Sequence, residues 1–175
     1  MFTIGQKVVD QNGKVFVVSS IEGKDFGKGR EDYLTLRPCF EEEFSKGYCS
    51  YVPLSSASSL IRLVMSKKQV KELACSYEDL EPRRFKNPRE RKTYFENVVK
   101  SKDSKERLRA IKSLVLYREE RKASKKVFSD FDRMLLDRLS SLLKSERAAA
   151  LDLSPEEVSG YIQKKIRKEK SRAAI

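Results

Sequence analysis

The first 65 residues alternate between short apolar runs and polar turns, a pattern typical of β-strands. Apolar runs at 6–10 and 14–21 flank a hairpin-type turn of Gln, Asn and Gly. Segments rich in Gly and charge predict loops at 22–30 and 41–47. Further strands are expected at residues 32–37, 48–52 and 60–65. Five short strands with tight turns predict a small, strongly bent β barrel.

From residue 66 the apolar period changes from two residues to 3.6, which predicts helices. A short helix is expected at 66–75, followed by a polar linker at 76–86. Four longer helices are predicted by apolar stripes at Tyr94, Phe95, Val98 and Val99; at Leu108, Ile111, Leu114 and Val115; at Phe128, Phe131, Leu135, Leu139 and Leu142; and at Val158, Tyr161, Ile162 and Ile166.

Two helix starts carry capping chemistry. Asn87 is a favourable N-cap, and Pro88 fits the first turn because its missing N–H has no intrahelical partner there. Ser154, Pro155 and Glu157 form a capping box at the start of the last helix. The predicted fold is therefore α+β and multidomain: a barrel over residues 1–65, then an all-α helical bundle over residues 66–175.

The composition removes most enzyme chemistry. The chain has no His, and its three cysteines form no CxxC pair, so zinc sites and His-activated nucleophiles lose their usual residues. No glycine-rich phosphate cradle is present. The acidic run Glu41–Glu43 is interpreted as a solvated hairpin tip, because adjacent side chains fan outward. We expect a protein that is not an enzyme, with no cofactor, no metal and no small-molecule substrate.

Three further features bear on the cellular location of the protein. No apolar run approaches the ~20 residues of a membrane span, and residues 1–7 lack the layout of a signal peptide. An odd number of cysteines is typical of thiols in a reducing compartment. These features favour a cytoplasmic protein that does not bind a membrane. We also expect a monomer, and the basic block described next adds the expectation that it is nucleoid-associated.

The net charge of +12 is concentrated in one part of the chain. Residues 1–65 hold eight basic and eight acidic side chains, whereas residues 83–126 hold 17 basic and six acidic ones. A localised basic block indicates a surface for a polyanion. The balanced first part instead favours a protein partner.

Two clusters make up this basic block. The first surrounds the helix start at Asn87, where the positive end of the helix dipole repels the cations. A bound external phosphate would offset this repulsion, because helix starts bind phosphate well. The second lies at the end of the next helix, where cations stabilise the helix without a ligand. For both clusters, a helix face that is only solvated, with no bound partner, stays an alternative. Phe85 precedes the helix and is a candidate base contact, whereas Tyr94 and Phe95 are interpreted as core. The predicted DNA-binding residues are Arg83, Arg84, Phe85, Lys86, Arg89, Arg91, Lys92, Arg118, Lys122, Lys125 and Lys126.

Short motifs in a common order resemble the CarD/CdnL family of bacterial transcription regulators. The resemblance begins at residues 2–9 and continues through 15–22, 32–36 and 52–53. In the helical part it rests on Tyr94, Ala110, Leu116 to Arg118, and Arg133 to Leu135. It covers the chain to about Leu151.

The resemblance implies two partners. A Tudor-like barrel would bind the β subunit of RNA polymerase by its sheet edge and hairpin loop, through Lys24, Phe26, Tyr51 and Val52. A family cation falls at Lys24, and Tyr51 stands where the family has a second cation. The helical domain would contact promoter DNA near the upstream edge of the melted region and stabilise the open complex.

The chain departs from the family on the DNA side. The family wedges a Trp into the minor groove, but this chain has no Trp, and Glu90 takes that position if Tyr94 matches the family Tyr. Pairing residues 82–86 with the family's basic-aromatic step is the alternative, although Pro88 then interrupts the helix. Phe85 could replace the wedge, or phosphate contacts alone could hold the DNA. Alternative functions are a stand-alone nucleic-acid-binding protein and a ribosome-associated adaptor.

Overall fold

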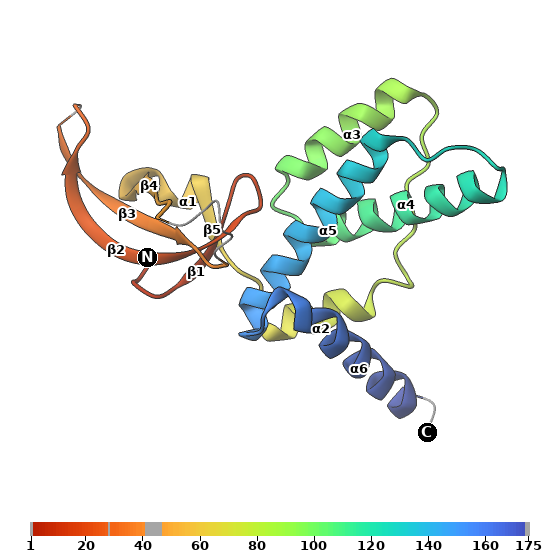
Figure 1. The fold of residues 1–175 in the computed structure, drawn as a ribbon. Helices are drawn as coiled ribbons and strands as arrows, with labels where there is room; N and C mark the ends of the chain where they lie inside the picture. The colour runs from red at the N-terminus through yellow and green to blue at the C-terminus, as the bar shows by residue number, and fades with distance from the viewer. Residues whose placement is uncertain (1, 28, 41–46, 174–175) are drawn as a thin grey trace.

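The computed structural model describes residues 2–27, 29–40 and 47–173, and the side chains up to Ile166 at the C-terminal end. Figure 1 shows a sheet half followed by a helical half, with the last helix extending away from the body. The chain is therefore α+β, as its hydrophobic pattern predicts. None of the helices in the described ranges has both the length and the apolar character needed to cross a bilayer.

Five antiparallel strands form one sheet, in the order β4-β3-β2-β1-β5. The strands are β1 (Lys7–Asp10), β2 (Val15–Asp25), β3 (Arg30–Pro38), β4 (Ser50–Pro53) and β5 (Ile61–Leu63). Between the described residues, no ladder joins β4 to β5, so the sheet is open and the predicted closed barrel is not observed. The chain from β4 to β5 instead forms two helical turns, η2 (Leu54–Ser56) and α1 (Ala57–Leu60), and Ala57 enters the core.

The β2–β3 hairpin is longer than the sequence predicts. Part of the loop expected at 22–30 is strand, because opposite charges face each other across the ladder: Lys24 opposite Glu31, and Asp25 opposite Arg30. A register shift between Val18 and Ser20 marks a β-bulge, which increases local strand twist. The predicted loop at 41–47, with its acidic run, lies outside the described residues except for its last position.

The helical half contains α2 (Lys67–Cys75), α3 (Pro88–Lys100), α4 (Ser104–Ala123), α5 (Asp130–Leu151) and α6 (Pro155–Ala173). Both predicted helix starts are confirmed. The Asn87 side chain accepts a hydrogen bond from the Glu90 N–H at 2.9 Å, and Pro88 is the first residue of α3. The Ser154 N–H donates to the Glu157 carboxylate at 2.9 Å before α6.

One apolar cluster joins α3, α4 and α5. Its buried members are Phe95, Val98, Ala110, Leu114, Leu135, Leu136 and Leu139. The predicted α5 stripe is wrong at its N-terminal end: Phe131 is 56% exposed, and Phe128 precedes the helix. The buried face of α5 rotates toward Leu136 and Leu143 because α4 packs along that side.

The two halves share a core and a network of buried charges. Val9 and Val15 of the sheet pack against Ala149 of α5, and the Lys7 ammonium donates to the Ala149 carbonyl at 2.9 Å and to Asp152 at 2.8 Å. Hydrogen bonds from Lys7 and Lys67 lower the pKa of Asp152 to about 2. This contact ties the first strand to the end of α5.

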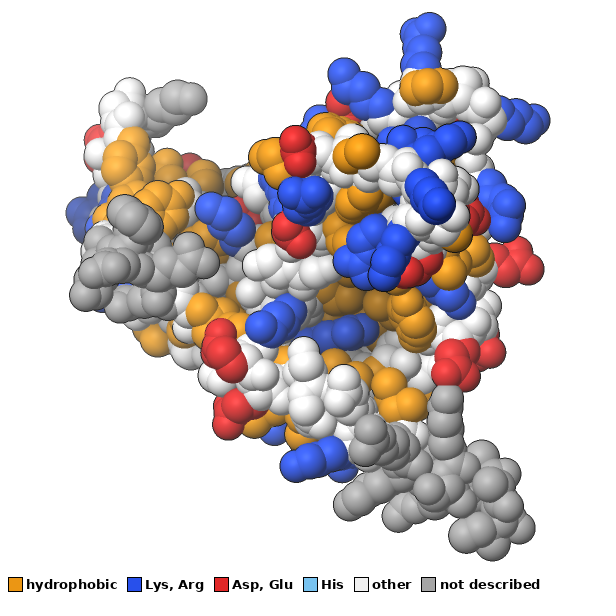
Figure 2. Space-filling model, turned by 45° about the vertical axis from the view of Figure 1, so that its right-hand side comes forward, with side chains coloured by type: hydrophobic (Ala, Val, Ile, Leu, Met, Phe, Trp, Pro, Cys, Tyr) orange, Lys and Arg blue, Asp and Glu red, His pale blue; other side chains and the backbone are white. Residues whose placement is uncertain are grey.

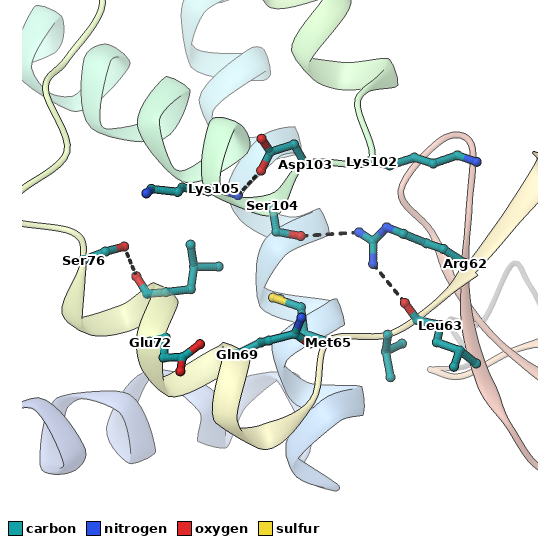
Figure 3. A pocket seen from close by; sticks show the side chains of 12 residues that line it. Arg62, Leu63, Met65, Gln69, Glu72, Ser76, Lys102, Asp103, Ser104 and Lys105 are labelled. Carbon is teal, nitrogen blue, oxygen red and sulfur yellow. Dashed lines mark hydrogen bonds between the residues drawn. The ribbon is translucent and has the colours of Figure 1, made fainter.

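Glu146 of α5 is the buried centre of this junction. Its side chain is fully buried, and it accepts a hydrogen bond from the Arg62 guanidinium at 2.9 Å. The Arg107 guanidinium, also buried, lies 3.7 Å from the same carboxylate. Arg62 reaches from the sheet across a hollow of about 520 Å³ to Ser104 at the start of α4 (Figure 3). A sheet strand and two helices therefore meet at a single carboxylate.

Candidate nucleic-acid and protein interfaces

The linker before α3 is fixed against α4, which positions the first basic cluster. The Arg83 N–H donates to the Ser113 hydroxyl at 2.8 Å. Beyond this anchor, the Arg84 side chain is 89% exposed and Lys86 is exposed as well. Phe85 between them is partly buried and packs against the α3–α4–α5 cluster. The linker thus directs its cations outward and its aromatic ring inward.

The start of α3 is capped by the chain's own side chains. Asn87 accepts from the Glu90 N–H, and the Glu90 carboxylate accepts from the Lys86 N–H at 3.1 Å. Glu90 therefore supplies the acidic group that a helix start favours. Because these backbone N–H groups are already bonded within the chain, a phosphate at this helix start would be bound mainly by the side chains of the nearby cations.

Arg91 faces the interior of the helical half. It pairs with Asp132 of α5, whose side chain is 3% exposed, and its guanidinium lies 5.5 Å and 4.8 Å from the ring centres of Phe95 and Tyr117. Asp132 also accepts from the Ser129 hydroxyl at 2.6 Å. Arg91 therefore ties α3 to α4 and α5, and its charge is already balanced by a buried carboxylate.

Tyr117 of α4 brings the two basic clusters together. Arg91 lies over this ring, and the guanidinium of Arg121, next to Lys122 of the second cluster, lies 5.9 Å from it. Arg84 of the linker lies 4.0 Å from Glu120 on α4. Between linker and α4 is a groove of about 520 Å³, which we call the linker–α4 groove. Figure 2 shows Lys and Arg side chains gathered over the helical half, around an area of hydrophobic side chains.

The second cluster lies at the C-terminus of α4, in a turn of defined geometry. The Lys126 N–H donates to the Arg121 carbonyl at 2.8 Å and the Lys125 N–H to the Lys122 carbonyl at 3.0 Å, the two bonds of a Schellman motif. Lys125 has a φ of +52°, in the left-handed region that glycine usually occupies at this position. Lys122, Lys125 and Lys126 are all exposed, and Arg118 pairs with Glu119 at 3.5 Å.

Three aromatic rings lie beneath the first cluster. Phe85 is 5.1 Å from Tyr94 and 5.5 Å from Phe95, between ring centres. Phe95 is 2% exposed, which confirms its predicted core position. The Tyr94 hydroxyl donates to Glu106 at 3.0 Å, and burial, followed by this hydrogen bond, raises the pKa of Tyr94 well above its usual range. These contacts give Tyr94 a structural role.

Three of the four residues expected to bind RNA polymerase lie together on the sheet. Phe26 is 54% exposed and lies 5.4 Å from Tyr51, between ring centres, and the Lys24 ammonium lies 5.0 Å from the Tyr51 ring. A hollow of about 370 Å³ adjoins Lys24 and Tyr51. Val52 is 7% exposed and packs in the sheet core, because neighbouring strand residues face opposite sides.

Residues outside the predicted binding sets complete both surfaces. Tyr33 packs edge-on against Phe26 at 4.9 Å, and Tyr117, Glu120 and Leu116 line the linker–α4 groove. The spacing of Tyr117 and Arg121, four residues apart on a helix, is a signal that places them on one face. No comparable local signal links Tyr33 to Phe26.

Comparison with known proteins finds no matching family model and no matching curated protein. Within residues 2–27, 29–40 and 47–166, no group of three His, Cys, Asp or Glu side chains is arranged to hold a metal ion. Because neither comparison finds a match, the CarD/CdnL resemblance stays a prediction from the sequence.

Proposed function

We propose that this chain is a transcription regulator of the CarD/CdnL kind. In this proposal, a Tudor-like sheet half binds the RNA polymerase β subunit, and the basic helical half binds promoter DNA and stabilises the open complex. The observation that carries the proposal is the presence of two chemically different surfaces on the two halves of one body. One surface carries aromatic rings with Lys24 beside them, and the other is strongly basic.

The sheet surface has the composition of a protein-binding site. Aromatic residues are enriched at the centre of protein interfaces, where they contribute most of the binding energy. Phe26 and Tyr51 are both more than two-fifths exposed although they are large and apolar in part. Since residues 1–65 have no net charge, a polyanion is a poor partner for this half.

The helical surface has the composition of a phosphate-binding site. Arg84, Lys86 and Arg89 are exposed around the start of α3, and the surface continues at the C-terminal end of α4 and in the following turn with Lys122, Lys125 and Lys126. Cations of this kind bind DNA by neutralising phosphates and releasing counterions. Because Phe85 is partly buried, phosphate contacts carry more of this proposal than an apolar wedge does.

A stand-alone nucleic-acid-binding protein is the second candidate. The basic helical surface would serve either function, so the sheet half decides between them. Small barrels that bind nucleic acid usually present aromatics among several cations. Here the described aromatic cluster has Lys24 beside Phe26 and Tyr51, with Lys24 also paired to Glu22 at 3.2 Å.

Retention of RNA polymerase on the immobilised 175-residue chain tests the proposal. We expect wild type to retain the β subunit, and Phe26→Ser to weaken retention about tenfold, as truncation of an interface anchor does. Phe131→Ser is the matched control, because it removes a ring of similar exposure, 56%, from the helical half.

Wild-type protein that does not retain RNA polymerase would overturn the proposal. In that case, retained DNA binding would favour the stand-alone nucleic-acid-binding protein. Equal losses in Phe26→Ser and Phe131→Ser would remove the sheet surface from the interface. Far-ultraviolet circular dichroism of both variants verifies that the fold is intact.

A further inference from the structure

The linker–α4 groove combines two kinds of lining on a scale suited to one small ligand. Its volume of about 520 Å³ lies within the range of small-ligand sites. Arg83, Arg84 and Lys86 supply cations at the linker side. Phe85, Leu116 and Tyr117 supply apolar surface. A ligand that fills the groove therefore needs an anionic part and an apolar part close together.

The groove has cations and apolar surface that the protein itself leaves accessible. The Arg84 side chain is 89% exposed, and its acidic neighbour, Glu120, lies only at the 4.0 Å limit of an ion pair. Leu116 is 41% exposed, although leucine is usually buried. By contrast, Arg91, which also lines the groove, is balanced by Asp132, so it contributes little attraction for an anion.

The mixed lining of the groove fits single-stranded DNA better than double-stranded DNA. Duplex DNA presents phosphates at its surface but keeps its bases stacked inside, so only extrusion of a base would fill the apolar side. A single strand presents a phosphate and an unstacked base within one nucleotide, and proteins bind such strands with cations beside aromatic or apolar side chains. Both requirements of the groove are met by one unpaired nucleotide.

We propose that the linker–α4 groove binds one unpaired nucleotide of single-stranded DNA. Its phosphate lies at Arg84 and Lys86, and its base lies against Phe85 and Leu116. Arg91 already covers a face of Tyr117, so Tyr117 forms the floor of the site rather than its stacking partner. This inference rests on the proposed DNA binding and adds a preference for melted strands, which the open complex contains.

Fluorescence anisotropy with two probes tests the inference: a labelled single-stranded oligonucleotide and a duplex of the same length and sequence. Leu116→Glu places a carboxylate beside the base position. We expect it to weaken single-strand binding about tenfold, the scale of one stacked base, and to weaken duplex binding much less. Met134→Glu is the matched control, because Met134 is 72% exposed, lies in the helical half outside the groove and undergoes the same charge change.

A second measurement uses the wild-type chain alone. Photo-crosslinking of an oligonucleotide that contains one bromouracil should label the peptide with Phe85 or the peptide with Leu116. Equal effects of Leu116→Glu and Met134→Glu on both probes, or crosslinks confined to other peptides, would overturn the inference while leaving DNA binding intact. Binding of neither probe by wild type would instead overturn the DNA arm of the proposed function itself.

Discussion

Lys125 holds a backbone conformation that costs a lysine free energy. Its φ of +52° places it at the left-handed position of the Schellman turn that ends α4. Asp152, at the end of α5, has a φ of +58°, but aspartate tolerates this region better than residues with long aliphatic side chains do. A strained residue that persists on an exposed basic surface is an indication of function. In the proposed function, Lys125 contacts a DNA phosphate.

Lys125→Gly should therefore separate stability from binding. We expect the free energy of unfolding to rise by about 1 kcal/mol, because glycine adopts the left-handed region without strain. The slope of log affinity for DNA against log salt should fall by about 0.9, the effect of one lost phosphate contact. Urea denaturation and binding titrations at several salt concentrations measure the two effects.

Lys126→Gly is the control for this prediction. This substitution removes the same charge one residue away, but Lys126 is not among the residues with positive φ. We expect it to lower the salt slope similarly without raising stability. A Lys125→Gly variant that gains stability and keeps the wild-type salt slope would return Lys125 to a role in the turn alone.

Helix α5 connects the two proposed surfaces. Near its start, Asp132 pairs with Arg91, one of the residues that line the linker–α4 groove. Three-quarters of the way along, Glu146 holds Arg62 of β5 and Arg107 of α4. Each of these carboxylates is buried, so each compensates a charge that would otherwise be costly to bury. The position of α5 therefore determines both the groove and the junction with the sheet.

Removal of the charge at the junction should destabilise the chain strongly. Glu146→Gln keeps the size of the side chain but leaves the buried Arg107 guanidinium without its carboxylate. We expect a loss of about 3–5 kcal/mol in the free energy of unfolding, measured by urea denaturation. Asp137→Asn, an exposed acid on the same helix, should change stability by less than about 0.5 kcal/mol. Equal stability of the two variants would show that the Glu146 network is not a stabilising contact.

At the scale of the whole molecule, the sheet and the helices share their core. Val9 and Val15 are buried partly by Ala149, and the Lys7 ammonium bonds to the end of α5. A partner on the sheet is therefore held at a defined place relative to the basic helical surface. In the proposed function, this fixed geometry is what positions the helical half on DNA beside RNA polymerase.

A shared core predicts cooperative unfolding of the intact chain. Differential scanning calorimetry should show one transition, with a calorimetric enthalpy equal to the van't Hoff enthalpy. Residues 1–65 alone should melt at a lower temperature, because separation exposes Val9 and Val15 to water. Two resolved transitions in the intact chain would contradict the shared core.

Features that depend on neighbouring residues could be predicted from the sequence. Periods of 2 and 3.6 located most strands and helices, and Asn87 marked the start of α3 through local capping chemistry. The segregation of charge was also visible in the sequence. The length of β2 was underestimated, since the pairing of Asp25 with Arg30 overrides the polar composition of that segment.

Which of the predicted site residues reach the surface depends instead on contacts between distant segments. Arg91 belongs to a basic run, but a carboxylate 41 residues away in the sequence draws it inside. Arg62 and Glu146 meet across 84 residues, and Tyr117 joins two basic clusters from different helices. Ion pairs and burial arise between segments that are distant along the chain, so a local pattern of hydrophobic and polar residues does not encode them.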